Sequence, residues 1–379
     1  MRDVYVLGVG MIKFGRFKDR DVHELAADAA LQALADAGMK IKDIELLASG
    51  NLLQASNMIG QRILQQIGQT GIPVINVSNA CATGSTAFRD AYFAVGSGEY
   101  EVAMAVGSEQ MGKAGLLGGG GGGESVEGIL GSGLMPAVFG QAGVEHMRQH
   151  GTTAEHFAKI SVKNHKHSVK NPLSQYQVEV SLDDVMQARM VAYPNTLYMC
   201  CPTGDGAAAA IVGSEAMVKK FGKKPVKVAC SVLTSDPWTP RDLTMPDVNT
   251  LTRNAAKEAY ERAGIGPDDL DLVELHDCFA TAELLHYENL GLCKEGQAGQ
   301  AVDEGWFEHG GKTPVNVSGG LLSKGHPLGA TGVANIFEVV THLRGEAGAR
   351  QVEGAKVGMA HVIGLGSACA VHVLEKAAA

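Results

Sequence analysis

The hydrophobic positions follow a helical spacing in two distant segments that are organised in the same way. Residues 26–51 carry apolar side chains at helical spacing, end their helical pattern before Gly38 and continue into an apolar strand. Residues 255–277 repeat this order, with Gly264 after the helical pattern and an acidic turn before the strand. Glycine directly after the last helical residue is typical of a left-handed C-terminal cap. Both segments therefore predict a helix–turn–strand unit.

A second repeated pattern extends this symmetry. Residues 82–95, ATGSTAFRDAYFAV, and 330–343, ATGVANIFEVVTHL, both predict a helix with a Gly/Ala-rich start, followed by a charged turn and an apolar strand. Alternation of strands and helices predicts parallel sheets covered by helices. The repeats predict an α/β fold with two similar halves, residues 1–224 and 225–379.

One segment of the first half has no counterpart in the second. It covers about residues 112–200 and opens with a glycine run at 118–123. This length is too great for a plain loop, so an inserted subdomain is predicted. The glycine run lacks a preceding strand in the right register and the GK[ST] sequence of a phosphate cradle, which favours a linker.

Composition and charge exclude several classes of protein. The 379 residues are 45% hydrophobic and 19% charged, as in an ordinary soluble globular protein. A net charge of −9 without a basic stripe argues against nucleic-acid binding, and no apolar run reaches the ~18 residues of a membrane span. Seven cysteines without a signal peptide predict a cytoplasmic location. The adjacent Cys200 and Cys201 have poor spacing for zinc, so no metal site is predicted.

Cys81 lies between the β-rich residues 73–78 and a predicted helix. A thiol at a helix N-terminus is exposed to the positive end of the helix dipole, which favours the thiolate. The alternative is a small buried residue in a tight strand-to-helix turn. A nucleophilic thiol requires a base and donors for an oxyanion, so the choice depends on its partners.

Two histidine motifs can supply these partners. His276 opens HDCF (276–279) at the carboxyl end of a predicted strand, where open α/β sheets place their chemistry. His326 lies in SKGHPLGATG (323–332), directly before the helix that repeats the one after Cys81. The internal symmetry thus predicts that Cys81 and His326 lie at equivalent helix N-termini.

The motifs NACATG, HDCF, GHPLGATG and GLGSACAVHVL, in this order, resemble the thiolase superfamily over essentially the whole chain. The HDCF form is similar to the sterol-carrier-protein or lipid-transfer branch. The resemblance implies a five-layer αβαβα thiolase fold, an obligate homodimer, and acyl transfer between a cysteine and coenzyme A. Coenzyme A is then a substrate, and no metal is expected in this chain.

The resemblance also implies a role for each motif residue. Cys81 is the nucleophile that carries the acyl group as a thioester, and His326 accepts its proton and then helps to hold the thioester oxygen. His276 is a second donor to that oxygen, and Cys278 is the acid/base at the α-carbon. Gly364 and the backbone N–H of Cys81 form a second oxyanion hole.

The sequence departs from the commonest thiolase pattern near its C-terminus. The second catalytic cysteine of that pattern is replaced by Val362, and Cys369 lies in a strand-like run that predicts a core position. The acid/base role therefore rests on Cys278.

The resemblance does not decide which reaction the protein catalyses. A 3-oxoacyl-CoA thiolase is preferred, with an aryl or branched substrate such as benzoylsuccinyl-CoA from anaerobic aromatic degradation. Alternatives are an acetoacetyl-CoA thiolase working in the condensing direction, a retro-aldolase for steroid side-chain CoA esters, and a non-catalytic lipid-binding protein. Retention of Cys81 argues against the retro-aldolase. Related proteins also suggest a small partner subunit with an OB-fold and a zinc ribbon.

Two further predictions concern the surface. The phosphates of coenzyme A require local cations, and Lys163, Lys166 and Lys170 lie at helical spacing in the insert, although a solvated helix face explains them equally well. Residues 73–80 are short, β-branched and uncharged, and such an edge strand without protective charges predicts pairing with a second copy.

Overall fold

A mixed sheet of nine strands forms the frame of the protein in the computed structural model, which describes residues 1–114, 134–222, 224–238, 240, 247–365 and 367–377. Its strand order is β3-β2-β4-β7-β1-β8-β11-β10-β9. The strands are β1 (Val4–Met11), β2 (Leu46–Gly50), β3 (Val74–Val77), β4 (Val102–Gln110), β7 (Asp205–Ser214), β8 (Val226–Thr234), β9 (Leu272–Glu274), β10 (Val357–Gly364) and β11 (Ala368–Lys376).

The sheet consists of two halves with the same internal order. β1 and β8 join the halves through only two residue pairs, Tyr5 with Lys227 and Val6 with Val226. An isolated parallel bridge between Val273 and Val315 occupies the place in the second half that β3 occupies in the first. The predicted similarity of the two halves is therefore confirmed by the strand pairing.

The prediction of parallel sheets is correct for only part of the strands. β2 pairs in parallel with β3 and β4, and β9 with β10, but β1, β7, β8 and β11 run antiparallel to their neighbours. β11 follows β10 after only the residues 365–367, and a parallel crossover requires a dozen or more residues. The short connection thus forces a hairpin.

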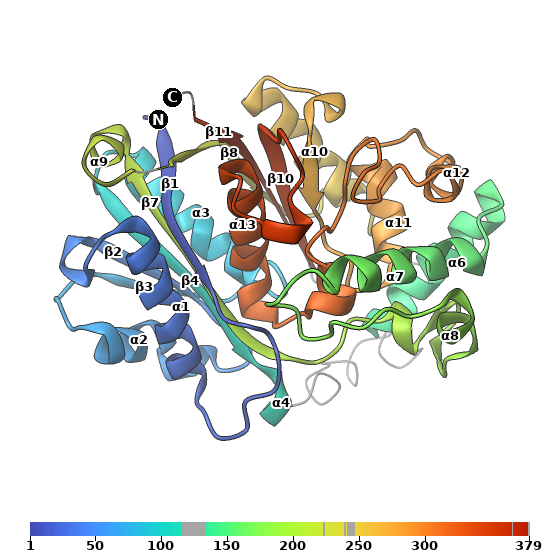
Figure 1. The fold of residues 1–379 in the computed structure, drawn as a ribbon, viewed down its shortest axis with the longest axis horizontal. Coiled ribbons are helices and arrows are strands. Elements are labelled where there is room, and N and C mark those ends of the chain that lie inside the picture. The colour runs from blue at the N-terminus through green and yellow to red at the C-terminus, as the bar shows by residue number, and fades with distance from the viewer. Residues whose placement is uncertain (115–133, 223, 239, 241–246, 366, 378–379) are drawn as a thin grey trace.

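Helices form three layers around the half-sheets (Figure 1). α3 (Thr83–Gly96) and α13 (Leu328–Arg344) pack on each other between the two half-sheets. α1 (Val22–Ala37) and α2 (Ile59–Ile67) cover the first half, and α10 (Thr250–Ala263) covers the second, with α11 (Ala280–Asn289) packed beside α10. This is the predicted five-layer αβαβα arrangement.

Glycine allows the two central helices to approach closely. A Cβ atom on Gly84 would lie 2.6 Å from the Gly329 carbonyl oxygen, and one on Gly332 would lie 2.2 Å from the Ser85 nitrogen. These positions explain the Gly/Ala-rich starts of both helices. The C-terminal caps are also as predicted, since Gly38 and Gly264 adopt left-handed φ values of 65° and 71°.

The segment between β4 and β7 packs against the second half (Figure 1). Its described elements are α4 (Met111–Ala114), α6 (Met135–His150), α7 (Ala154–Ser168), α8 (Leu182–Gln187) and the hairpin of β5 (Met190–Ala192) and β6 (Asn195–Thr196). α6 and α7 contact α11, and α7 also contacts the π-helical turn Gly320–Lys324. The glycine run 118–123 lies outside the described residues, and the domain boundary at 224/225 stays a prediction.

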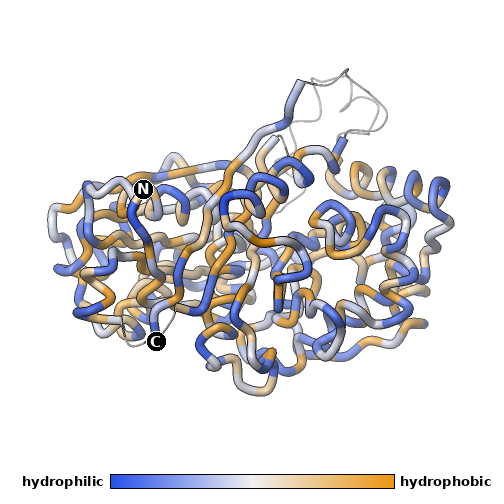
Figure 2. The backbone as a smooth tube through the Cα atoms, turned by 90° about the horizontal axis from the view of Figure 1, so that it is seen from above, coloured by the Kyte–Doolittle hydropathy of each residue, from blue (hydrophilic) through white to orange (hydrophobic). Residues whose placement is uncertain are grey.

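Hydrophobic and hydrophilic residues alternate along the helices at the surface, as Figure 2 shows. Three large clusters of buried apolar side chains lie beneath α1, around α3 and α13, and beneath α10 and α11. In the described part of the chain, no helix has both the length and the apolar character that a membrane crossing requires. The remaining described α-helices are α9 (Glu215–Phe221) and α12 (Ala298–Asp303).

Candidate active site

Cys81 lies in a tight turn between β3 and α3. Ala80 adopts a left-handed φ of 46°, and the Thr83 hydroxyl donates to its carbonyl oxygen at 2.6 Å and accepts from the Asn79 N–H at 2.7 Å. Cys81 is buried, and burial raises the pKa of its thiol to about 12, although backbone N–H groups including that of Leu365 act in the opposite direction. The predicted dipole effect is therefore outweighed by desolvation, and the thiol requires a base.

Two histidines converge on this thiol. One ligand-type atom from each of Cys81, His276 and His326 lies within 4.8 Å of the other two, and the two rings meet edge to face at a centroid distance of 5.0 Å. Burial lowers the pKa of His326 to about 3, and burial followed by the proximity of His326 lowers the pKa of His276 well below its usual value. Both imidazoles are therefore neutral near neutral pH.

The hydrogen bonds of Thr331 fix the protonation pattern of His326. The Thr331 hydroxyl donates to the Pro327 carbonyl oxygen at 3.0 Å, so it accepts from Nδ1–H of His326 at 2.7 Å. Nε2 then carries the lone pair, and no described group pairs with this buried atom. His326 thus presents a proton acceptor to the catalytic cluster, and Thr331 is a positioning residue that the sequence reasoning missed.

Asp277 connects the two histidine loops. Its carboxylate accepts from the backbone N–H groups of Leu321 and Leu322 at 2.7 and 3.2 Å, and from the Asn164 side chain at 2.8 Å. These bonds tie the HDCF loop to the π-helical turn directly before His326. Asp277 was also missed, although its position between His276 and Cys278 was a signal.

Cys278 lies beside the same cluster. It is buried, and burial, followed by the proximity of Cys201 and Cys81, raises the pKa of its thiol well above the usual value. Its carbonyl oxygen accepts from the Cys201 N–H at 2.9 Å, which places an unpredicted third cysteine nearby. Cys369 is buried in β11 with its sulfur 4.0 Å from the Thr252 hydroxyl, consistent with a core position.

Gly364 ends β10 against the Cys81 turn. A Cβ atom at this position would lie 3.0 Å from the Asn79 carbonyl oxygen and 3.3 Å from the Ala82 nitrogen. Val362 is fully buried in a small apolar cluster that includes Cys81. The structure therefore brings all the residues of the predicted catalytic set together: Cys81, His276, Cys278, His326 and Gly364.

The predicted cationic face of the insert is only partly at the surface. Lys163 is buried, with its ammonium 2.5 Å from the Glu283 carboxylate and 2.9 Å from the Val315 carbonyl oxygen, so its charge is already paired inside the protein and its position does not support the predicted contact with coenzyme A. This face of α7 packs against α11 and is interior. Lys166 and Lys170 border a cavity of about 270 Å³, and their contact with coenzyme A stays a prediction.

The burial of Lys163 leads to a stability prediction. Lys163→Met leaves the Glu283 carboxylate buried without its cation, which costs about 3–5 kcal/mol in the free energy of unfolding. Lys166→Met is the matched control, because its ion pair with Glu308 is exposed and worth at most about 1 kcal/mol. Urea unfolding of the three proteins measures the difference. Equal losses in both variants would contradict the assignment of Lys163 to the interior.

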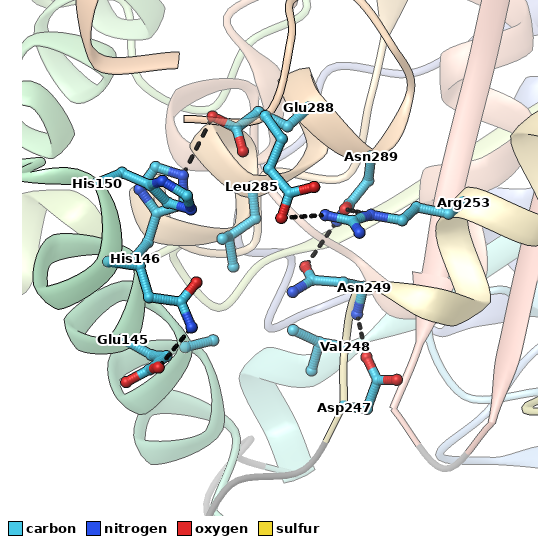
Figure 3. Close-up of a pocket in the computed structure, with 13 residues that line it drawn as sticks. Glu145, His146, His150, Asp247, Val248, Asn249, Arg253, Leu285, Glu288 and Asn289 are labelled. Carbon is cyan, nitrogen blue, oxygen red and sulfur yellow. Dashed lines mark hydrogen bonds and ion pairs between the residues drawn. The ribbon is translucent and has the colours of Figure 1, made fainter. Parts of the chain in front are cut away.

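A second polar cavity, of about 190 Å³, lies between α6, α10 and α11 (Figure 3). The Arg253 guanidinium donates to the Asn289 side chain at 2.9 Å, and His146 contacts Thr152 at 2.8 Å and Glu288 at 3.1 Å. None of the predicted catalytic residues is among the residues that line it. Its polar groups are largely paired with one another.

The sequence matches known protein families whose chemistry is consistent with this site. Residues 4–216 match the model of the thiolase N-terminal domain, and residues 238–376 match that of the thiolase C-terminal domain-like family. The chain belongs to the thiolase family. It is an acyl-CoA acyltransferase, for which coenzyme A is a substrate.

The similar proteins include the branch that the HDCF motif indicated. The chain is 45% identical to sterol carrier protein 2 of Homo sapiens, over 98% of this chain and 71% of that protein. It is 39% identical to acetyl-CoA acetyltransferase of Methanothermobacter thermautotrophicus, over 99% and 100% of the two chains. It is also 39% identical to benzoylsuccinyl-CoA thiolase subunit BbsB of Thauera aromatica, over 96% and 95%.

Solved structures share the fold at lower identity. An Ltp2-ChsH2(DUF35) aldolase superposes with a TM-score of 0.83 at 21% identity, covering 99% of this chain and 98% of that one. Human mitochondrial 3-ketoacyl-CoA thiolase superposes with a TM-score of 0.76 at 20% identity, covering 100% and 99%. The predicted thiolase fold is confirmed.

Proposed function

We propose that the protein cleaves a 3-oxoacyl-CoA with coenzyme A through a thioester on Cys81. The observation that supports this most strongly is the convergence of the Cys81 thiol with two neutral histidines, beside the Cys278 thiol. This set contains a nucleophile, a base, an oxyanion donor and a separate acid/base.

In the first half-reaction, Nε2 of His326 takes the thiol proton, and the thiolate attacks the C3 carbonyl. Backbone N–H groups at Cys81 and Gly364 hold the resulting oxyanion, and donors of this kind lower the barrier by roughly 3–4 kcal/mol each. The C2–C3 bond then breaks. His276 and the protonated His326 hold the thioester oxygen of the enolate, and the Cys278 thiol protonates C2.

In the second half-reaction, the Cys278 thiolate takes the proton of the incoming coenzyme A thiol. The coenzyme A sulfur attacks the acyl group, Cys81 leaves as thiolate, and His326 returns the proton that it had taken. Each catalytic group regains its starting state.

For the acyl group, we propose an aryl or branched chain such as that of benzoylsuccinyl-CoA. The similarity to the Thauera aromatica subunit supports this, while equal identity to the archaeal acetyl-CoA acetyltransferase supports acetoacetyl-CoA as the alternative. The presence of Cys81 in the cluster favours thiolysis over the retro-aldol cleavage suggested by the name of the aldolase with the same fold. That name also supports a small DUF35-type partner subunit.

We also propose a cytoplasmic location.

The substrate proposal is tested by steady-state thiolysis of a panel that includes acetoacetyl-CoA and benzoylsuccinyl-CoA. We expect cleavage to require free coenzyme A, and kcat/KM for the aryl substrate to be at least about tenfold higher, an advantage of roughly 1.4 kcal/mol. A preference for acetoacetyl-CoA would favour the alternative substrate. Cleavage without coenzyme A that releases an aldehyde or ketone would contradict thiolysis altogether.

We also propose that the protein is a homodimer paired through β3. β3 has one described strand neighbour, β2, and Ile75 on it is 39% exposed. An apolar edge without protecting charges favours pairing across a two-fold axis, with an interface above ~2,000 Å².

The dimer is tested by light scattering at micromolar protein. We expect twice the chain mass of 39.6 kDa for the native protein, and a shift towards the monomer in Ile75→Lys. Leu31→Lys on α1, which is 48% exposed, is the control and should leave the mass unchanged. An active native monomer would contradict the proposal.

A further inference from the structure

Cys81, His276 and His326 form the one group of three clustered potential metal ligands found in the described part of the chain. Their ligand-type atoms lie within 4.8 Å of one another, and all three side chains are buried. A tetrahedral zinc ion with the usual bond lengths holds sulfur and nitrogen ligands about 3.4–3.6 Å apart. The ligand atoms therefore need to approach one another by at most about 1.2–1.4 Å.

The histidines carry ring nitrogens that no described group satisfies. Nδ1 of His276 and Nε2 of His326 are buried without a hydrogen-bond partner. A buried polar atom without a partner is costly, so a ligand that completes its coordination gains free energy. For His326 this observation is independent of the spacing, because its unpaired Nε2 carries a lone pair that a cation can accept.

The surroundings of His326 suit metal binding. The Thr331 hydroxyl accepts Nδ1–H of His326, which leaves the Nε2 lone pair directed away from that bond and fixes the ring. Such outer hydrogen bonds are typical of metal-bound histidines. Glu109 lies near Cys81, and burial raises the pKa of its carboxyl group to about 7, so we do not count it as a ligand or a fixed charge of the site.

We propose that the catalytic cluster is also a site for a soft divalent cation of the zinc class, bound by Cys81, His276 and His326 with the fourth position open to water. Binding releases the thiol proton of Cys81 to solvent as the metal–sulfur bond forms. The cation occupies both the nucleophile and its base, so it holds the enzyme in a reversible, inactive form. This regulatory meaning rests on the proposed function, whereas binding itself rests only on the geometry.

Direct binding tests the site without any assay of activity. Co²⁺ added to the chelator-treated protein should give one equivalent of a complex with thiolate-to-cobalt charge-transfer absorption, which Zn²⁺ then displaces. Cys81→Ala should abolish the absorption band, and Thr331→Val should weaken Zn²⁺ binding about 10–100-fold. Cys201→Ala removes a neighbouring thiol outside the cluster and should retain full binding. Absence of the band, or its persistence in Cys81→Ala, would overturn the proposal.

Activity provides a separate comparison. Thiolysis should proceed in the presence of a chelator, fall at least tenfold with one equivalent of Zn²⁺, and return when the chelator is added again. Thiolysis that resists saturating Zn²⁺ would overturn the inhibitory role. Loss of thiolysis in the chelator with normal Co²⁺ binding would instead contradict the proposed metal-free reaction, so the two failures are distinguishable.

Discussion

Cys81→Ser is expected to lower thiolysis by roughly 10³-fold or more while the protein remains folded. Serine is nearly isosteric, so the packing of this buried turn is preserved. An alcohol is far less acidic than a thiol, and a base with a strongly lowered pKa such as His326 does not activate it. Mass spectrometry of the native protein with acyl-CoA should show the acyl group on the peptide that contains Cys81. An adduct on Cys278 or Cys293 would contradict the assignment.

The pH dependence of Cys81 separates two ways of activating the thiol. Burial raises its pKa to about 12, so the thiolate fraction, and with it alkylation by iodoacetamide, should rise about tenfold per pH unit through the neutral range. Thiolysis itself should change little over that range, because neutral His326 removes the proton only when substrate is bound. An alkylation rate that is already constant at neutral pH would show a preformed thiolate instead.

The layers of the fold could be predicted from the local pattern of apolar and polar residues, because this pattern reflects which faces of a helix or strand are buried. α13 is buried on nearly every side, and its sequence is apolar around its circumference apart from polar groups such as Glu338, as expected for a helix between two sheets. The repeated Gly/Ala-rich starts reflect the contact of two helices with each other. The direction of a strand is harder to predict from the sequence, because it depends on which distant strand becomes the neighbour of β7.

Cys81, His276 and His326 could be singled out as candidates because each lies where an element ends or begins, whereas Cys278 and Gly364 came from the family resemblance. Internal symmetry placed Cys81 and His326 at equivalent helix starts, and the structure brings them together with His276. Thr331 and Asp277 were missed because their importance lies in hydrogen bonds to particular partners, Thr331 to the His326 ring and Asp277 to the turn before His326.

The insert shows why charge spacing alone is insufficient. On α7 the spacing of Lys163, Lys166 and Lys170 suggested either a contact with coenzyme A or a solvated face, yet Lys163 is buried. Lys163 pairs with Glu283, which is 120 residues away in the chain. No local pattern contains that partner, and without it a buried lysine is energetically implausible.

Cys278→Ala is expected to slow exchange of the α-protons of acetyl-CoA with deuterated solvent by about 10²–10⁴-fold, the usual contribution of a general acid/base. Acylation of Cys81 should remain measurable, because His326 rather than Cys278 takes the proton of the nucleophile. The exchange is followed by mass spectrometry of acetyl-CoA, and acylation by the adduct on the Cys81 peptide.

Cys201→Ala is the matched control, because Cys201 and Cys278 are joined by a backbone hydrogen bond of 2.9 Å and both thiols have a pKa raised chiefly by burial. Position, rather than acidity, therefore distinguishes the two thiols. Cys278 follows His276 by two residues in the loop that Asp277 ties to the turn before His326. We expect exchange in Cys201→Ala to stay within about tenfold of the native rate, since it loses no catalytic group. If the loss of exchange followed Cys201 instead, the acid/base role would belong to the cysteine that the sequence had not indicated.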